Sequence, residues 1–132
     1  RKFVDAKING FSTVEVWGTG KVFREFMHVD DLARAAIFFM NNPIDENLIN
    51  IGWGKEISII ELVELIRKNT SFKGDIVWDS SKKDGTIRKR LDVFKILEYG
   101  FKPEISLKEG IKLTIESYCN EHLKKSFQSL TN

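Results

Sequence analysis

The sequence is poor in cysteine and proline and has no long hydrophobic run. Cys119 is the single cysteine, so an internal disulfide is excluded, which fits a reducing compartment. The longest apolar run, AAIFFM at residues 35–40, is far shorter than the ~20 residues that a helix needs to span a bilayer. No charged amino-terminal region with a cleavage site opens the chain. We therefore expect a cytoplasmic protein that does not act at a membrane.

An excess of charge of one sign is also missing. The chain has 21 Lys and Arg residues against 19 Asp and Glu residues, for a net charge of +2. This balance gives no overall field for capturing nucleic acid, so we expect no nucleic-acid partner. Hydrophobic residues make up 42% and charged residues 30%, as in ordinary globular proteins. A length of 132 residues suffices for one domain with its own core.

Motifs for catalysis and cofactor binding are absent as well. The sequence contains no complete glycine-rich phosphate loop and no nucleophile motif. We therefore assign no catalytic, cofactor-binding or metal-binding residue to this chain. It begins at Arg1 without an initiator methionine, inside the segment RKFVDAKING, which is predicted as a helix that ends at Asn9 and Gly10. We expect the chain to be the back part of a larger protein.

Alternating helical and extended patterns predict an α/β fold. Short apolar runs bounded by turn residues predict strands at residues 13–17, 22–29, 47–52 and 75–78. The first two strands either pair as a hairpin or serve different sheets. Capping residues and helical periodicity predict helices that begin near residues 30, 58, 92 and 106. In the second of these, Ser58 and Glu61 form a capping box, and in the first, Asp30 or Asp31 is the predicted cap.

Trp17 and Arg24 stand on either side of a glycine turn, Gly18-Thr19-Gly20. An arginine in an extended segment beside a turn can hold an anion by two parallel hydrogen bonds, or it can form a surface ion pair with Glu25 or an aspartate. A tryptophan next to glycines can stack on a planar ring, or it can be an ordinary core residue. From the residues alone, the core interpretation of the tryptophan is the favoured one.

Two further polar segments have competing interpretations. The segment His28-Val29-Asp30-Asp31 suggests metal or acid–base chemistry, but helix capping explains its aspartates without either. The run of residues 82–90, KKDGTIRKR, combines a turn at Asp84-Gly85 with several cations, which suits a phosphate or diphosphate. The alternative is a solvated charged loop.

Three blocks of the sequence carry a resemblance to a known family: VEVWGTGKVFREFMHVDDLARA, NLINIGWG with ISIIELVELI, and DIVWDSSKKDGTIRKRLDV. They resemble the carboxyl-terminal part of the extended short-chain dehydrogenase/reductases, which belong to the NAD-dependent epimerase/dehydratases and act on nucleotide sugars. WGTG together with SKxDGTxRKxLD is similar to the GDP-L-fucose synthase branch. The resemblance implies an enzyme that epimerises GDP-4-keto-6-deoxy-D-mannose and reduces it with NADPH to GDP-L-fucose.

The same resemblance implies a fold and a set of site residues. Residues 1–132 would be a single small mixed α/β substrate domain, in which residues 28–52 complete the Rossmann-type sheet of the cofactor domain. The residues implied to bind the GDP-sugar substrate are Lys2, Trp17, Arg24, Asp84 and Arg88. Catalytic groups and the NADP site precede this region in the family, so the isolated chain is expected to be inactive. The resemblance also implies that the intact enzyme is a homodimer. The alternatives are a fragment of another nucleotide-sugar epimerase, dehydratase or reductase, and a stand-alone nucleotide-sugar binding or assembly module.

Overall fold

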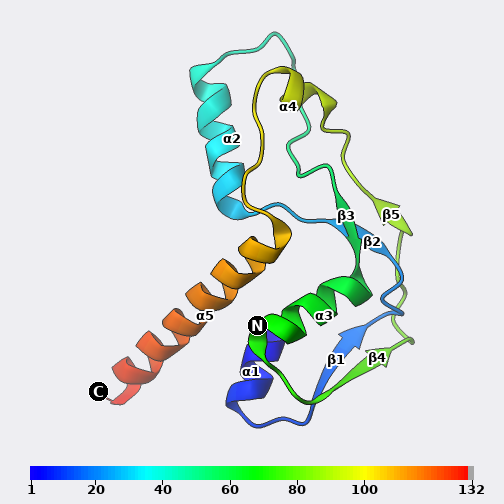
Figure 1. Ribbon diagram of the computed structural model, residues 1–132, viewed down its shortest axis with the longest axis vertical. Helices are drawn as coiled ribbons and strands as arrows, with labels where there is room; N and C mark the ends of the chain where they lie inside the picture. Colours follow the sequence, from blue (N-terminus) through cyan, green and yellow to red (C-terminus); the bar gives the residue numbers. More distant parts are fainter. Residues whose placement is uncertain (131–132) are drawn as a thin grey trace.

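Two hydrophobic clusters lie at opposite ends of an elongated molecule (Figure 1). The computed structural model describes residues 1–130, with side chains described through residue 122. The first cluster is built on Phe3, Val14, Val63 and Phe72, and the second on Ala35, Ile96 and Phe101. The mixed α/β architecture confirms the predicted class.

The first cluster joins two helices to a two-stranded parallel sheet. The elements are α1 (Lys2–Ile8), β1 (Thr13–Trp17), α3 (Ile59–Thr70) and β4 (Asp75–Asp79). Phe3 of α1 meets Phe72 edge-on, with ring centroids 5.6 Å apart. The pairing of β1 with β4 sets Trp17 opposite Asp79. The chain therefore brings the glycine turn after β1 beside the loop that follows β4, two segments about sixty residues apart in the sequence.

A second, three-stranded sheet lies between the two clusters (Figure 1). Its strands are β2 (Phe23–Glu25), β3 (Glu56–Ser58) and β5 (Arg88–Lys89), in the order β3-β2-β5. Strand β2 is antiparallel to β3 and parallel to β5. Strands β1 and β2 thus serve different sheets, and the hairpin alternative is wrong. Sequence patterns did not indicate β5, because two charged residues carry no alternation of apolar and polar positions.

The second cluster packs α2 (Val29–Asn41) against α4 (Phe94–Glu98). Helix α5 (Leu107–Leu130) then runs back toward α1 (Figure 1). Near its middle, the Tyr118 hydroxyl donates a hydrogen bond to the Asp5 carboxylate of α1 at 2.8 Å. The last helix therefore connects the two ends of the molecule. None of the helices within residues 1–130 is long and apolar enough to cross a membrane.

The start of α2 differs from the prediction of an aspartate cap. His28 is the N-cap, and its Nδ1 accepts a hydrogen bond from the Asp30 amide at 3.3 Å. Asp31 is fully buried and accepts the backbone amides of Glu104 and Ile105 instead. The aspartate therefore fastens the segment before α5 to α2. The predicted capping box of Ser58 at the start of α3 is confirmed.

The predicted strand at residues 47–52 is wrong for this structure. Between residues 42 and 55, in the described part of the chain, no strand forms. Ile49 and Ile51 are partly buried against the second cluster. A strand needs a neighbouring strand for its backbone hydrogen bonds, and an apolar run alone cannot supply one.

Candidate functional site

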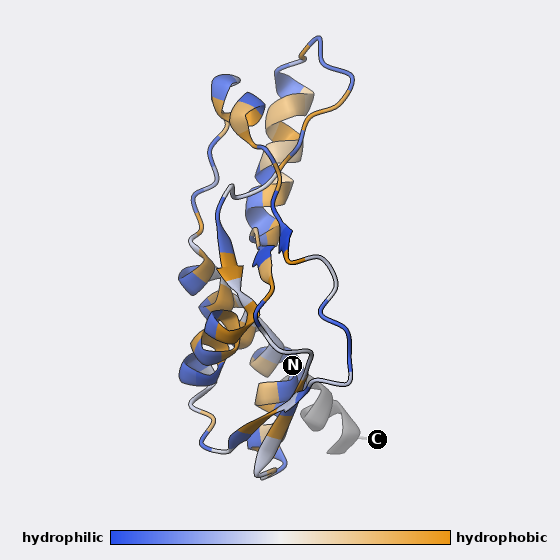
Figure 2. Ribbon diagram, turned by 90° about the vertical axis from the view of Figure 1, so that its right-hand side faces the viewer, coloured by the Kyte–Doolittle hydropathy of each residue, from blue (hydrophilic) through white to orange (hydrophobic). Residues whose placement is uncertain are grey.

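Four of the five predicted site residues gather where β1 and β4 end. The Gly18 amide, just after Trp17, donates to the Asp79 carbonyl at 2.9 Å and so continues the pairing of the two strands. From there, the segment between β4 and β5 leaves the body of the molecule as a mostly hydrophilic loop (Figure 2). The ammonium of Lys2 lies against the ring of Trp17, Asp84 bonds to the glycine turn, and Arg24 bonds to the loop.

Trp17 is a surface residue, with 63% of its area exposed. The interpretation as a core tryptophan is therefore wrong. Its indole Nε1 donates to the Glu15 carboxylate at 3.1 Å, which fixes the ring on the surface. The ammonium groups of Lys2 and Lys82 lie 5.4 and 5.7 Å from the ring centroid. We call Lys2, Trp17 and Lys82 the Trp17 cluster.

Arg24 is half-buried beneath the loop between β4 and β5. Its guanidinium donates to the carbonyl oxygens of Phe23 at 2.6 Å, Thr86 at 2.8 Å and Asp84 at 3.3 Å. The surface ion pair with Glu25 does not form, because that carboxylate accepts the amides of Gly54 and Leu91. Since a guanidinium has five N–H donors, two remain after these three contacts, and they are available to an anion.

Asp84 holds the loop to the glycine turn. Its carboxylate accepts the Thr19 amide at 2.7 Å and the Thr19 hydroxyl at 2.5 Å. These two hydrogen bonds lower the pKa of Asp84, with smaller contributions from the charges of Lys21 and Arg24. Gly18 has a φ of +83°, and a Cβ added there would collide with the Asp84 carboxylate. The glycine is therefore required by the close approach of the aspartate as well as by its backbone conformation.

Arg88 does not join the other four predicted residues. Its guanidinium forms an ion pair with Glu56 at 3.0 Å and lies 4.9 Å from the centroid of the Phe23 ring. Both partners belong to the strands β3 and β2 of its own sheet. These contacts tie the edge strand β5 to its neighbours.

A cavity of about 260 Å³ lies beside Arg24. Arg24, Lys89 and Arg90 bring positive charge to it, Glu25 brings a negative one, and Met27 is among its apolar lining residues. The sequence placed Lys89 and Arg90 only within the basic run of residues 82–90. The pairing of Lys89 with Arg24 could not be predicted from local patterns, because β5 itself was not predicted.

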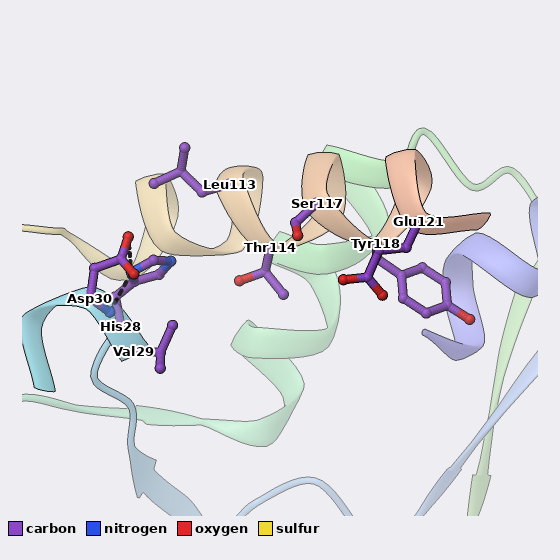
Figure 3. A pocket seen from close by; sticks show the side chains of 8 residues that line it. All are labelled: His28, Val29, Asp30, Leu113, Thr114, Ser117, Tyr118 and Glu121. Carbon is purple, nitrogen blue, oxygen red and sulfur yellow. Dashed lines mark hydrogen bonds and ion pairs between the residues drawn. The ribbon is translucent and has the colours of Figure 1, made fainter. Parts of the chain in front are cut away.

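Another cavity, of about 400 Å³, lies between the start of α2 and helix α5. Figure 3 shows His28 and Asp30 at one end of it, and Tyr118 and Glu121 on α5 at the other. Its lining has the carboxylates of Asp30 and Glu121 and no lysine or arginine. Such a cavity is electrostatically unsuited to a polyanionic ligand.

Comparison with known proteins supports the resemblance noted in the sequence. Residues 1–52 match the family model of the NAD dependent epimerase/dehydratase family. GDP-L-fucose synthase 1 of Arabidopsis thaliana is 44% identical over 124 residues, which are 91% of this chain and 38% of that protein. The chain is similar in sequence to part of the GDP-L-fucose synthases. It spans well under half the length of the curated relatives that it matches.

Solved structures confirm the expected fold of an extended short-chain dehydrogenase/reductase. A GDP-L-fucose synthetase from Naegleria fowleri, bound to NADP, has a TM-score of 0.85 at 29% identity and covers 92% of this chain and 38% of its own. The UDP-glucose 4-epimerase of Thermotoga maritima, with UDP-glucose, has a TM-score of 0.78 at 30% identity and covers 90% of this chain and 38% of its own.

Proposed function

We propose that this chain is the GDP-sugar-binding part of an enzyme that makes GDP-L-fucose from GDP-4-keto-6-deoxy-D-mannose by epimerisation and NADPH-dependent reduction. The observation that carries the proposal is the exposed ring of Trp17, with lysines against it, beside the loop that Arg24 and Asp84 hold in place. A planar surface next to fixed cations suits a nucleoside diphosphate.

Each site residue has a distinct part in the proposal. Trp17 offers a stacking surface, and Lys2 brings a positive charge to it. Arg24 offers its two remaining N–H donors to the diphosphate, and Asp84 keeps the loop closed on the glycine turn. Arg88 is a further diphosphate contact if the ligand displaces it from Glu56. Binding the nucleotide end in this way orients the sugar for chemistry at its reacting carbons.

The residues of this chain do not fit the dinucleotide cofactor. Gly18 and Gly20 follow strand β1, but the next element is strand β2 rather than a helix, and Phe23 stands at the position of the third glycine. A Cβ on Gly20 would collide with the side chains of Trp78 and Ile60, so packing explains this glycine. We assign NADP, which supplies the hydride, and the catalytic groups to a part of the enzyme outside these residues.

Helix α2 supports the proposal that residues 28–52 join the sheet of a cofactor domain in the intact enzyme. Its apolar side chains Val29, Leu32, Ile37 and Met40 are 68%, 48%, 59% and 80% exposed. An amphipathic helix with this much apolar surface gains stability when a second layer covers it. We propose a cytoplasmic, homodimeric enzyme as the complete protein.

The nucleotide preference of the complete gene product tests the proposed function. Calorimetric titration is expected to give tighter binding of GDP than of UDP. Tighter binding of UDP would indicate another nucleotide-sugar enzyme, such as a UDP-sugar epimerase. In parallel, the 132-residue chain alone is expected to oxidise no NADPH with the keto-sugar, and clear turnover would contradict the assignment of the catalytic groups to a region outside it.

A further inference from the structure

Lys82 and Lys2 approach the same exposed aromatic ring from different parts of the chain. The Lys2 ammonium lies 5.4 Å from the centroid of Trp17, and the Lys82 ammonium lies 5.7 Å from it. Lys2 is further held by a hydrogen bond to the Glu15 carbonyl at 3.0 Å. Two positive charges thus converge on one planar surface, 63% of which is open to solvent.

The backbone fixes where Lys82 emerges. The Asp79 carbonyl accepts the Gly18 amide at 2.9 Å and the Lys82 amide at 3.2 Å, so one oxygen joins the end of β1 to the turn that carries the lysine. The Asp79 carboxylate accepts the amide and the hydroxyl of Ser81 at 3.0 and 2.5 Å. The turn that presents Lys82 is therefore tied to the strand end that presents Trp17.

The carboxylates near the two lysines form hydrogen bonds with other groups. The three acidic groups around them are engaged by neutral donors: Glu15 by the indole of Trp17, Asp79 by Ser81, and Asp84 by Thr19. Within residues 1–122, whose side chains are described, neither Lys2 nor Lys82 forms an ion pair. The two ammonium groups are therefore not tied to a carboxylate, unlike the guanidinium of Arg88, which pairs with Glu56.

We propose that Lys82 is a further substrate-binding residue. When a nucleoside diphosphate binds, the Lys82 ammonium moves away from the Trp17 ring and contacts the phosphates. The proposal rests on the proposed function of this site. A cation–π contact at an exposed ring is weaker than a charge-assisted hydrogen bond to a phosphate, so the ligand draws the ammonium away from the ring. Departure of Lys82 also uncovers the aromatic surface for stacking. Lys82 thus couples recognition of the phosphates to exposure of the Trp17 ring.

Lys82→Gln in the complete gene product tests this role, with Lys83→Gln as the matched control. Lys83 is the next residue, is also exposed and loses the same charge, but makes no contact with Trp17. Calorimetric titration with GDP, GMP and guanosine separates phosphate recognition from base recognition. Lys82→Gln is expected to weaken GDP binding about tenfold, GMP binding less, and guanosine binding less than about twofold. Lys83→Gln should leave all three within about twofold, and Lys82→Arg should retain most of the GDP affinity.

Each contrary result has a separate meaning. Equal losses of GDP affinity in the two glutamine variants would show that Lys82 acts only through net charge, and the proposal would be wrong. An equal loss for guanosine and GDP would place Lys82 at the base or in the packing and would also overturn it. If the unmodified protein binds no GDP, the proposed function fails, and this role of Lys82 fails with it. Thermal unfolding of the variants verifies that the exposed substitution leaves the fold intact.

Discussion

Asp84 and Thr19 form two hydrogen bonds that close the loop after β4 onto the turn after β1. The carboxylate accepts the Thr19 amide at 2.7 Å and the Thr19 hydroxyl at 2.5 Å, across 65 positions of sequence. Arg24 contacts the same loop from below, through the carbonyls of Thr86 and Asp84. The loop at the proposed nucleotide site is therefore held at two points, by Thr19 and by Arg24.

Acidification is expected to break the two hydrogen bonds between Asp84 and Thr19. The hydrogen bonds from Thr19 lower the pKa of Asp84 below its ordinary value of 3.8. Because the pKa of Asp84 is lower in the folded state, the contact contributes its full stability at pH values above the ordinary pKa. This stability is lost as the pH falls through the lowered pKa of the folded state. We expect the NMR signal of the Thr19 amide to shift in this acidic window and to stay constant between about pH 5 and 7. A midpoint above the ordinary value would contradict the assignment, and Asp84→Asn, as the control, should abolish the titration.

Gly18→Ala is expected to damage the site more than its backbone conformation alone explains. Its φ of +83° disfavours any other residue by about 1–2 kcal/mol, and its new methyl group would also collide with the Asp84 carboxylate. Gly10→Ala is the control, since Gly10 has a φ of +69° and open space around its Cβ position. We expect similar strain in both variants but a loss of GDP affinity only in Gly18→Ala, measured by thermal unfolding and calorimetry. Equal GDP affinity in the two variants would show that Asp84 adapts to the methyl group.

Arg24→Lys is expected to lose most of the function of the arginine although it keeps the charge. One ammonium cannot reproduce the planar contacts to Phe23, Thr86 and Asp84 together with two further donors. We expect GDP binding to weaken about tenfold or more and protease cleavage within the loop to become faster. Calorimetry and limited proteolysis measure the two effects. An unchanged affinity with a lowered melting temperature would show that Arg24 is purely structural.

Asp31→Ala is expected to be strongly destabilising. Burial alone would raise the pKa of Asp31, but the amides of Ile105 and Glu104 and the guanidinium of Arg34 together lower it. Removing the carboxylate leaves the amides of Glu104 and Ile105 without their acceptor, while Arg34 keeps its ion pair with Glu104, so we expect a loss of about 1–3 kcal/mol in the free energy of unfolding. Chemical denaturation measures this loss. Asp30→Ala provides the comparison: its side chain is 69% exposed, and the expected cost is below about 1 kcal/mol. A similar cost for both variants would contradict the role of Asp31.

Local signals in the sequence predicted most helices and strands, but fewer of the segments against which they pack or pair. Strand β1 and the capping box of Ser58 and Glu61 have the predicted positions, because both depend on residues within one or two turns of each other. The predicted cap of α2 is wrong, because His28 takes the capping position and the Asp31 carboxylate accepts hydrogen bonds from backbone amides 73 and 74 residues away. The strand at residues 47–52 is wrong because an apolar run does not specify its neighbour.

By itself, the sequence determined the alternation of helices and strands and the relationship to GDP-L-fucose synthases. Only the tertiary structure decided that β1 pairs with β4, that Arg24 is bound to loop carbonyls, and that Lys82 lies against the exposed ring. The physical reason is the separation in sequence of the residues that make contact. Periodicity and caps follow from contacts between near neighbours, whereas these arrangements join segments about sixty residues apart, whose meeting depends on how the whole chain packs.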